Sequence, residues 1–374
     1  MRAQLLTSLD ELPAVEDGWR DLAESAGNAF LTPEWFHCWQ ESAAAGADWA
    51  VAVVPGEAGK LDGVLPLVLE GSRRRRTIRF PEARLGDHFH PLARYGDEGS
   101  VAAAAAEELL RAGERVGMSV LVNIDRGARW PRALWAGRTP KTNRQSESEL
   151  PFVTLPGSWD DYLAARSANF RQQIRRRERK LAKLGDLRLR SASAESLEAD
   201  MATLFRLHLL RWEGRGRSAL ADPAAQDFLR RFARAAQERG WLRLHTLELD
   251  GEPIAAFFGW RLGARYAFYQ SGFDPAHADH SVGSVILAMT IRSAIEEGAH
   301  EFDMLLGTEP YKRRFTDRAR PVETVVVAGA RSARGLLLTG EAAARRRGRE
   351  LARRPRLEAA VRKVAGRMPS AWRS

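Results

Sequence analysis

The chain has 374 residues, of which 44% are hydrophobic, so it is long enough for two globular domains with ordinary apolar cores. Its single cysteine, Cys38, excludes an internal disulfide and a zinc site built from cysteine pairs. The net charge of +10 comes from residues 331–374, which hold 13 Lys and Arg against 3 Asp and Glu, while the rest of the chain is balanced.

The first part of the chain is typical of helices followed by strands. Apolar residues recur at helical spacing between residues 8 and 47, where Thr32-Pro33-Glu34 is a cap followed by proline at the first helical position. Glycines between residues 56 and 63 separate two apolar segments that we expect to pair as strands. The predicted elements are helices within 8–47, strands at 49–54 and 64–69, a helix at 102–116 and a strand at 119–124.

The second part of the chain repeats this order. Asp250-Gly251 is a hairpin turn signal, and Gly263 marks the next turn. An apolar face from Val285 to Ile295 predicts a helix that ends at Gly298. The predicted elements are one or two helices over 159–184, helices at 197–213 and 224–239, strands at 241–249, 254–260 and 265–271, a helix at 284–297 and a strand at 300–306.

The two parts share an order of helices, a strand hairpin, a helix closed by glycine and a strand. Residues 100–123 can be aligned with residues 284–305 as a weak internal repeat. The fold class is therefore α/β (α+β), with two domains that each hold a mostly antiparallel sheet flanked by helices. We expect an N-terminal domain at 1–150, a C-terminal domain at 151–330 and a basic helical tail at 331–374.

The segment from Tyr266 to Ser284 has the pattern of an anion-binding site. An aromatic strand ends at Gly272-Phe273, and a loop of small residues leads through Gly283 into a helix. Free N–H groups and the helix dipole attract phosphate at such a helix N-terminus, and glycine lets the backbone approach the anion. A plain connection with a serine cap is the alternative.

Polar residues follow the last predicted strand. Asp303 lies within an otherwise apolar strand, and Glu309, Tyr311 and Lys312 come after Gly307. A strand end that carries a carboxylate, a phenol and an ammonium can serve acid–base chemistry. The alternatives are a buried Asp303 satisfied by backbone N–H groups and a Lys312 that is an ordinary surface charge.

Two further clusters carry cationic side chains. Arg211 and Trp212 end a predicted helix before a glycine-rich turn, which suits either a clamp for an anionic or ring-shaped ligand or a plain helix C-terminus. Residues 167–181 place arginines on one face of a helix, either as a solvated surface or as a contact for phosphate or nucleic acid.

Together these segments resemble the bacterial GNAT acetyltransferases of the CelD/BcsL group, which is associated with cellulose biosynthesis. The resemblance covers about residues 5–330 and implies a tandem GNAT-like fold related to the FemAB-type peptidoglycan aminoacyltransferases. The matching pieces, in chain order, are Phe30-Leu31-Thr32-Pro33-Glu34-Trp35, the Arg-Arg-x-Glu-Arg-Lys-Leu run within 169–184, Arg211-Trp212-Glu213-Gly214-Arg215-Gly216, Ser271-Gly272-Phe273-Asp274-Pro275, Gly283 before a helix, and 302–312 from Phe302-Asp303 to Tyr311-Lys312.

The resemblance implies an acyl-CoA co-substrate such as acetyl-CoA, with no permanently bound cofactor and no metal. GNAT domains bind the donor pyrophosphate at a Gln/Arg-x-x-Gly-x-Gly/Ala loop, which here reads His280-Ser281-Val282-Gly283-Ser284-Val285. The first and last positions depart from that pattern, which leaves acyl carrier protein open as the donor. The implied donor-binding residues are Gln270, Gly272, Phe273, Ser281, Val282, Gly283, Ser284 and Val285.

The mechanism implied by this fold is direct transfer to an amine or hydroxyl of a small molecule or saccharide. A backbone N–H near residues 270–272 polarises the thioester carbonyl. Tyr311 is the candidate acid that protonates the departing thiolate, and Asp303 or Glu309 is the candidate base. The candidate substrate-binding residues are Arg211, Trp212 and Lys312.

Two other functions remain open. A FemAB-like enzyme would take its aminoacyl group from aminoacyl-tRNA, whose phosphates the basic residues 171–180 could hold, although nucleic acid is not the partner that we expect. A non-catalytic GNAT-like module would bind a metabolite or a polysaccharide-export partner, and the altered pyrophosphate loop favours it.

The two ends of the chain bear on location. The N-terminus turns acidic before a signal-peptide core could form, and no apolar stretch reaches the ~18 residues of a membrane span, so we expect a cytoplasmic protein. The basic segment 341–367, interrupted by Pro355, is either a solvated tail or a contact for an anionic membrane surface. Membrane contact would place the protein at the periphery of the inner membrane surface.

Overall fold

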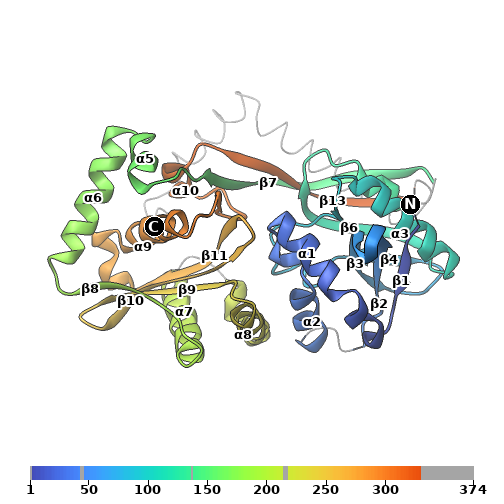
Figure 1. Cartoon of the computed structure of the whole chain (residues 1–374), viewed down its shortest axis with the longest axis horizontal. Helices are drawn as coiled ribbons and strands as arrows, with labels where there is room; N and C mark the ends of the chain where they lie inside the picture. Colours follow the sequence, from blue (N-terminus) through green and yellow to red (C-terminus); the bar gives the residue numbers. More distant parts are fainter. Residues whose placement is uncertain (1, 43–45, 136–137, 214–217, 330–374) are drawn as a thin grey trace, which may run out of the picture.

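The structure is a computed structural model that describes residues 2–42, 46–135, 138–213 and 218–329 (Figure 1). The basic tail and its expected membrane contact therefore lie outside the described residues, as does the glycine-rich turn after Arg211-Trp212-Glu213. Within the described ranges, thirteen strands form one mixed sheet that runs through two lobes. None of the helices in these ranges combines the length and apolar character that a membrane crossing needs.

The N-terminal lobe arranges its strands in the order β1-β2-β3-β4-β6. All neighbours are antiparallel except β4 and β6, which are parallel because the chain crosses over through a helix between them. The strands are β1 (Gln4–Leu6), β2 (Trp49–Pro55), β3 (Leu61–Glu70), β4 (Arg76–Arg79), the short β5 (Leu92–Ala93) beside β3, and β6 (Val116–Asp125). The helices are α1 (Glu16–Ala26), α2 (Pro33–Ser42), α3 (Glu98–Arg111) and α4 (Trp130–Ala133).

The C-terminal lobe has the same arrangement, β8-β9-β10-β11-β12, again with its parallel pair at the last two strands. The weak repeat in the sequence thus corresponds to a repeated topology, and the predicted α/β class is confirmed. The strands are β8 (Leu187–Ser191), β9 (Leu242–Leu249), β10 (Glu252–Leu262), β11 (Arg265–Phe273) and β12 (Glu301–Asp303). The helices are α5 (Trp159–Ala164), α6 (Ala168–Ala182), α7 (Leu197–Trp212), α8 (Pro223–Glu238), α9 (Val282–Glu296) and α10 (Lys312–Phe315), with a 3-10 turn η5 (Pro275–His280) before α9.

The two lobes exchange their sixth strands. β7 (Pro140–Thr154) follows β6 in the chain, yet its C-terminal end pairs with β12 of the other lobe. β13 (Ala319–Gly329) follows β12 in the chain and pairs with β6 of the first lobe. β7 and β13 also pair with each other and run between the lobes (Figure 1). The expected division between residues 150 and 151 falls inside β7.

Local capping explains why the main helices begin where the sequence predicts. The Thr32 hydroxyl accepts a hydrogen bond from the Trp35 N–H at 3.2 Å, and Pro33 takes the first position of α2. Gly27 ends α1 in the left-handed conformation at φ 61°. Asp222 caps the N-terminus of α8, as Thr32 caps that of α2, by accepting a hydrogen bond from the Ala224 N–H at 3.0 Å.

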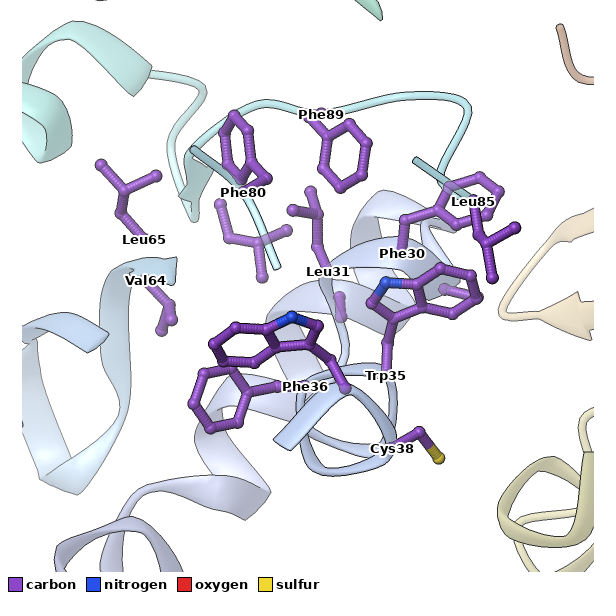
Figure 2. Close-up of a cluster of buried hydrophobic side chains, with 14 of the residues drawn as sticks. Phe30, Leu31, Trp35, Phe36, Cys38, Val64, Leu65, Phe80, Leu85 and Phe89 are labelled. Atoms are coloured by element: carbon purple, nitrogen blue, oxygen red, sulfur yellow. The ribbon is translucent and has the colours of Figure 1, made fainter. Parts of the chain in front are cut away.

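A continuous apolar core fixes the two lobes against each other. Figure 2 shows its aromatic part in the N-terminal lobe, with Phe30 and Trp35 beside Leu85. The Trp35 ring packs edge-on against Phe228 of α8, with ring centroids 4.6 Å apart, and the Phe30 ring packs on Trp260 of β10 at 5.4 Å. A second apolar cluster lies on the other face of β10 and β11, under α5, α6 and α9. Groups from the N-terminal lobe can therefore be held rigidly against the C-terminal sheet.

Candidate functional site

A pocket of about 250 Å³ opens in the C-terminal lobe between β11, the start of α9 and the end of α7. Most of its wall is apolar, as expected for a site that binds a small organic ligand. The predicted site residues in its wall are Arg211, Phe273, Ser281, Val282, Gly283, Ser284 and Tyr311. The remaining wall residues are Phe257, Phe268, Ser271, Ala278, Ile286 and Leu287.

The pocket lies where β11 and β12 separate. β12 pairs with β11 along Arg265–Ala267 and ends at Asp303, whereas β11 continues to Phe273. The register against β10 shifts at Tyr269, which is the extra residue of a β-bulge. The bulge places Phe268 and Ser271 on the same side of β11, and both line the pocket. A strand edge that has lost its neighbour offers backbone N–H groups to a carbonyl oxygen.

The start of α9 forms the second wall. Ser281 adopts a left-handed backbone conformation at φ 56° and turns the chain into the helix. The first N–H groups of a helix have no acceptor within it, and the helix dipole makes this end positive. The side chain of Val285 is 2% exposed and packs in the core, which anchors the loop from below. Ser281, Gly283 and Ser284 line the pocket above it.

Arg211 and Tyr311 close the pocket from the third side. Arg211 lies in the last turn of α7, and its guanidinium donates to the Ser271 hydroxyl at 3.1 Å. The same guanidinium lies 5.4 Å from the centre of the Phe273 ring and 5.8 Å from that of Tyr311. Burial, together with the charge of Glu309, raises the pKa of the Tyr311 phenol. Tyr311 therefore keeps its proton at neutral pH, and its phenol O–H is the candidate proton donor of the pocket.

Besides Val285 and Lys312, three predicted ligand-binding residues do not line the pocket. A Cβ on Gly272 would lie 2.2 Å from the backbone nitrogen of His208, so this glycine allows α7 to pack closely against β11. Gln270 pairs with Phe258 just after the bulge, on the side of β11 that faces away from Ser271. Trp212 is 37% exposed at the end of α7, where its ring stacks on His208 at 5.9 Å. Their binding roles remain predictions.

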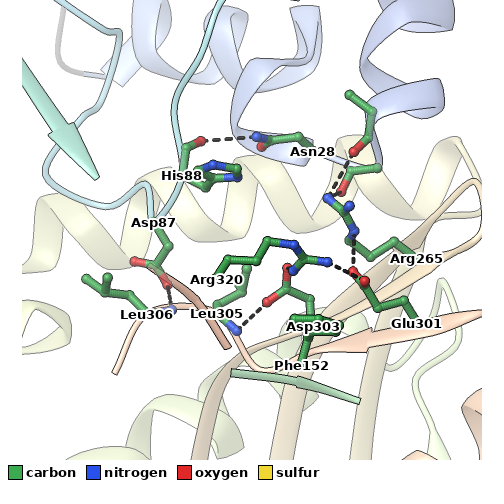
Figure 3. Close-up of polar contacts among 12 residues, drawn as sticks. Asn28, Asp87, His88, Phe152, Arg265, Glu301, Asp303, Leu305, Leu306 and Arg320 are labelled. Atoms are coloured by element: carbon green, nitrogen blue, oxygen red, sulfur yellow. Dashed lines mark hydrogen bonds and ion pairs between the residues drawn. The ribbon is translucent and has the colours of Figure 1, made fainter. Parts of the chain in front are cut away.

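The predicted carboxylates also lie outside the pocket wall. Asp303 is 2% exposed, its Oδ1 accepts from the Leu305 N–H at 2.8 Å, and its Oδ2 lies 3.2 Å from the Arg320 guanidinium (Figure 3). These contacts match the alternative of a buried, satisfied aspartate. Glu309 is exposed and forms an ion pair with Lys312 at 3.3 Å.

Lys312 is buried close to the inner end of the pocket. Its side chain is 5% exposed, and its ammonium lies 6.0 Å from the centre of the Phe268 ring. The ammonium donates to the Leu306 carbonyl at 2.8 Å, and burial lowers its pKa. Lys312 thus lies buried beside the pocket, and it is not an ordinary surface charge.

Sequence reasoning missed one further residue beside this site, Asp87 in the loop between β4 and β5. Its Oδ2 accepts from the Leu306 N–H at 3.2 Å, across 219 residues of chain (Figure 3). No local pattern indicates this contact, because the packing of one lobe on the other creates it.

Comparisons with known proteins agree with this architecture. Residues 168–313 match the family model of the acetyltransferase (GNAT) domain, so the C-terminal lobe carries a GNAT-type acyltransferase domain. No curated protein matches the sequence. The CelD/BcsL likeness is not confirmed by these comparisons.

The similar solved structures share the fold at low sequence identity. The crystal structure of FemX has a TM-score of 0.61 at 10% identity, covering 88% of this chain and 97% of FemX. The C-terminal domain (DUF2156) of a protein described as a lysylphosphatidylglycerol synthetase, from Agrobacterium fabrum, has a TM-score of 0.53 at 14% identity, covering 87% of this chain and 95% of that domain. L-PGS from Bacillus licheniformis has a TM-score of 0.50 at 12% identity, covering 87% of this chain and 96% of its own.

Proposed function

We propose that the protein transfers an acyl group from a thioester donor, either acyl-CoA or an acyl carrier protein, to an amine or hydroxyl acceptor. One observation carries this proposal: the start of α9, the free edge of β11 and the Tyr311 phenol converge on one pocket. These are the parts that thioester chemistry needs, namely an anion site, a donor to the carbonyl oxygen and a proton source.

The donor phosphate binds at the N-terminus of α9 in this proposal. Gly283 contributes its backbone N–H group there, and Arg211 contributes the nearest cationic side chain along the wall. The phosphopantetheine arm, which both donor types share, extends along the apolar side chains of Phe268 and Leu287. The departure from the GNAT loop at Val285 has little consequence for binding, because this side chain points into the core.

The chemical step follows from the same geometry. The acceptor nitrogen or oxygen forms a bond to the acyl carbon while a β11 N–H stabilises the negative charge on the carbonyl oxygen. The carbon–sulfur bond then breaks, and Tyr311 gives its proton to the departing thiolate. The buried ammonium of Lys312 adds positive charge near the inner end of the pocket.

The CelD/BcsL likeness suggests a small-molecule or saccharide acceptor in polysaccharide or cell-envelope metabolism. We include a cytoplasmic location in the proposal, because both donor types are cytoplasmic molecules. The acceptor class is tested by supplying amines, amino sugars and hydroxyl compounds with acetyl-CoA and following thiol release.

Calorimetric titration with acetyl-CoA and longer acyl-CoAs is the direct test of the donor site. Gly283→Leu places a side chain at the mouth of α9 and should weaken donor binding at least tenfold, or about 1.4 kcal/mol. Gly99→Leu is the matched control, because Gly99 holds the same second position in α3 of the other lobe. Equal donor affinity in the two variants would remove the α9 site from the proposal.

The second candidate is aminoacyl transfer from aminoacyl-tRNA, favoured by the exposed arginines of α6 and by the likeness to FemX. Arg175, Arg176 and Arg179 are exposed on this helix. If they contact RNA phosphates, tRNA binding should weaken steeply between 50 and 200 mM salt, by about 10-fold or more for each pair of phosphates. Salt-independent or absent tRNA binding excludes this candidate and leaves the thioester donor.

A further inference from the structure

We propose that Asp87, which the N-terminal lobe supplies, is the base that takes the proton from the acceptor during acyl transfer in the C-terminal lobe. This inference rests on the proposed function and deepens it by naming a catalytic residue and the side from which the acceptor arrives. It replaces the two carboxylates that the sequence suggested for this role.

The loop that carries Asp87 packs directly on the point where β11 and β12 separate. The Tyr269 hydroxyl, at the bulge of β11, donates to the Leu85 carbonyl at 2.7 Å. The Leu306 N–H, three residues after β12, donates to Asp87 Oδ2 at 3.2 Å. The loop therefore contacts both β11 and the segment that follows β12.

Asp87 and the donor pocket lie on opposite faces of the sheet, at the place where β11 and β12 separate. Phe268 lines the donor pocket and belongs to the apolar cluster under α9, whereas Tyr269 belongs to the cluster between the lobes. Lys312 lies between the two sides, with its ammonium near the Phe268 ring and bonded to the Leu306 carbonyl. An acceptor that reaches the solvent-exposed part of Asp87 can attack a thioester carbonyl held on the α9 side, with Asp87 behind it.

The Asp87 carboxylate is available for proton transfer. Its side chain is recessed but keeps part of its surface in contact with solvent. Oδ2 is used by Leu306, while Oδ1 accepts no hydrogen bond from any residue that the structure describes. Burial raises the pKa of Asp87 to about 6, against the opposing effects of the Leu306 hydrogen bond and the Lys312 charge, with Asp303 and Glu309 adding to the rise. A base with this pKa is ionised at neutral pH and still accepts a proton readily.

The two other carboxylates are less suited to the role. Both oxygens of Asp303 are occupied, by Leu305 and Arg320, and the side chain is 3% exposed. Glu309 lies on the surface and is paired with Lys312. Asp87 alone among these three combines a recessed position, a free oxygen and contact with the separating strands.

The proton balance is complete with these groups. The acceptor N–H or O–H gives its proton to Asp87 Oδ1 as its lone pair forms the bond to the acyl carbon. The carbon–sulfur bond breaks, and the thiolate takes the Tyr311 proton. Exchange with solvent then returns Asp87 to the ionised form and Tyr311 to the neutral form.

The test compares the intact protein with Asp87→Asn, which keeps an oxygen for the Leu306 N–H and removes the base. Thiol release from acetyl-CoA is measured between pH 5 and 9, with glucosamine and with water as acceptors, and acetyl-CoA affinity is measured by titration. The intact protein should lose activity below about pH 6 as Asp87 takes up a proton. Asp87→Asn should lack this pH dependence and lose about 10²–10⁴-fold in kcat at an unchanged acetyl-CoA Kd.

Glu82→Gln is the matched control, because Glu82 is a buried carboxylate of the same loop that pairs with Arg84 instead of Leu306. The control should keep the rate and the pH dependence. Asp87→Asn with full activity and an unchanged acidic limb overturns the inference, as does an equal loss in Glu82→Gln. A protein that neither binds acyl-CoA nor releases thiol from it overturns the proposed function and, with it, this role.

Discussion

Replacing Asp87 by asparagine should stabilise the protein, and the gain should depend on pH. Burial raises the pKa of this carboxyl from its usual 3.8 to about 6, so the folded state binds the proton more tightly than the unfolded chain does. Above pH 6 the group is ionised in both states, and the folded state bears the full cost of holding a recessed charge. Below about pH 4 the group is protonated in both states, and the cost disappears.

The size of the effect follows from the pKa shift. One pKa unit corresponds to about 1.4 kcal/mol, so the shift amounts to about 3 kcal/mol at most. Because part of the side chain still contacts solvent, we expect a gain of about 1–3 kcal/mol for Asp87→Asn at pH 8. Such a cost in the native protein is typical of a residue kept for its chemistry.

Urea unfolding at pH 4, 6 and 8 measures this difference directly. The difference in the free energy of unfolding between Asp87→Asn and the intact protein should increase as the pH rises from 4 to 6. Asp317→Asn serves as the control, because Asp317 is exposed. Its free energy of unfolding should differ little from that of the intact protein at every pH. A variant whose stability relative to the intact protein is the same at pH 4 and pH 8 would refute the reasoning about Asp87.

Three other substitutions separate chemistry from structure. Tyr311→Phe should lower kcat by about 10²-fold with little change in KM, as steady-state kinetics would show; full activity would exclude the phenol as the acid. Asp303→Asn should lower the free energy of unfolding by about 1–3 kcal/mol and leave acetyl-CoA affinity unchanged, whereas a stable variant with a lost rate would restore Asp303 as the base. Trp35→Ala, in the core between the lobes, should cost about 3–5 kcal/mol in urea unfolding; a loss below 1 kcal/mol would contradict the packed contact of Trp35 with α8.

The sequence predicted the elements whose signals are local. Helices with caps, such as α2 after Thr32, and hairpins with turn glycines, such as Asp250-Gly251, appear within a few residues of their expected places. The loop into α9 was identified because a strand, small residues and a helix follow each other directly. Phe273, Ser281 and Gly283 accordingly line the pocket.

Features that depend on contacts between distant parts of the chain could not be predicted from the sequence. β7 is rich in polar residues, since much of its surface is exposed between the lobes, and its apolar alternation is too weak to predict a strand. Gly272 has the same local signature as a ligand-binding glycine, but its actual neighbour is His208 on α7. Asp87 gains its environment only when the lobes pack, so nothing near it in the chain indicates its position.

The exchange of β7 and β13 has a consequence for how the protein is made. During synthesis the N-terminal lobe leaves the ribosome with one edge of β6 unpaired, because its partner β13 is about 200 residues further along the chain. The first lobe can be completed only when β13 arrives, and by then the second lobe and its pocket have also been translated. Assembly of the pocket and closure of the first lobe are thereby coupled, and the contact between Asp87 and Leu306 should form among the last of all.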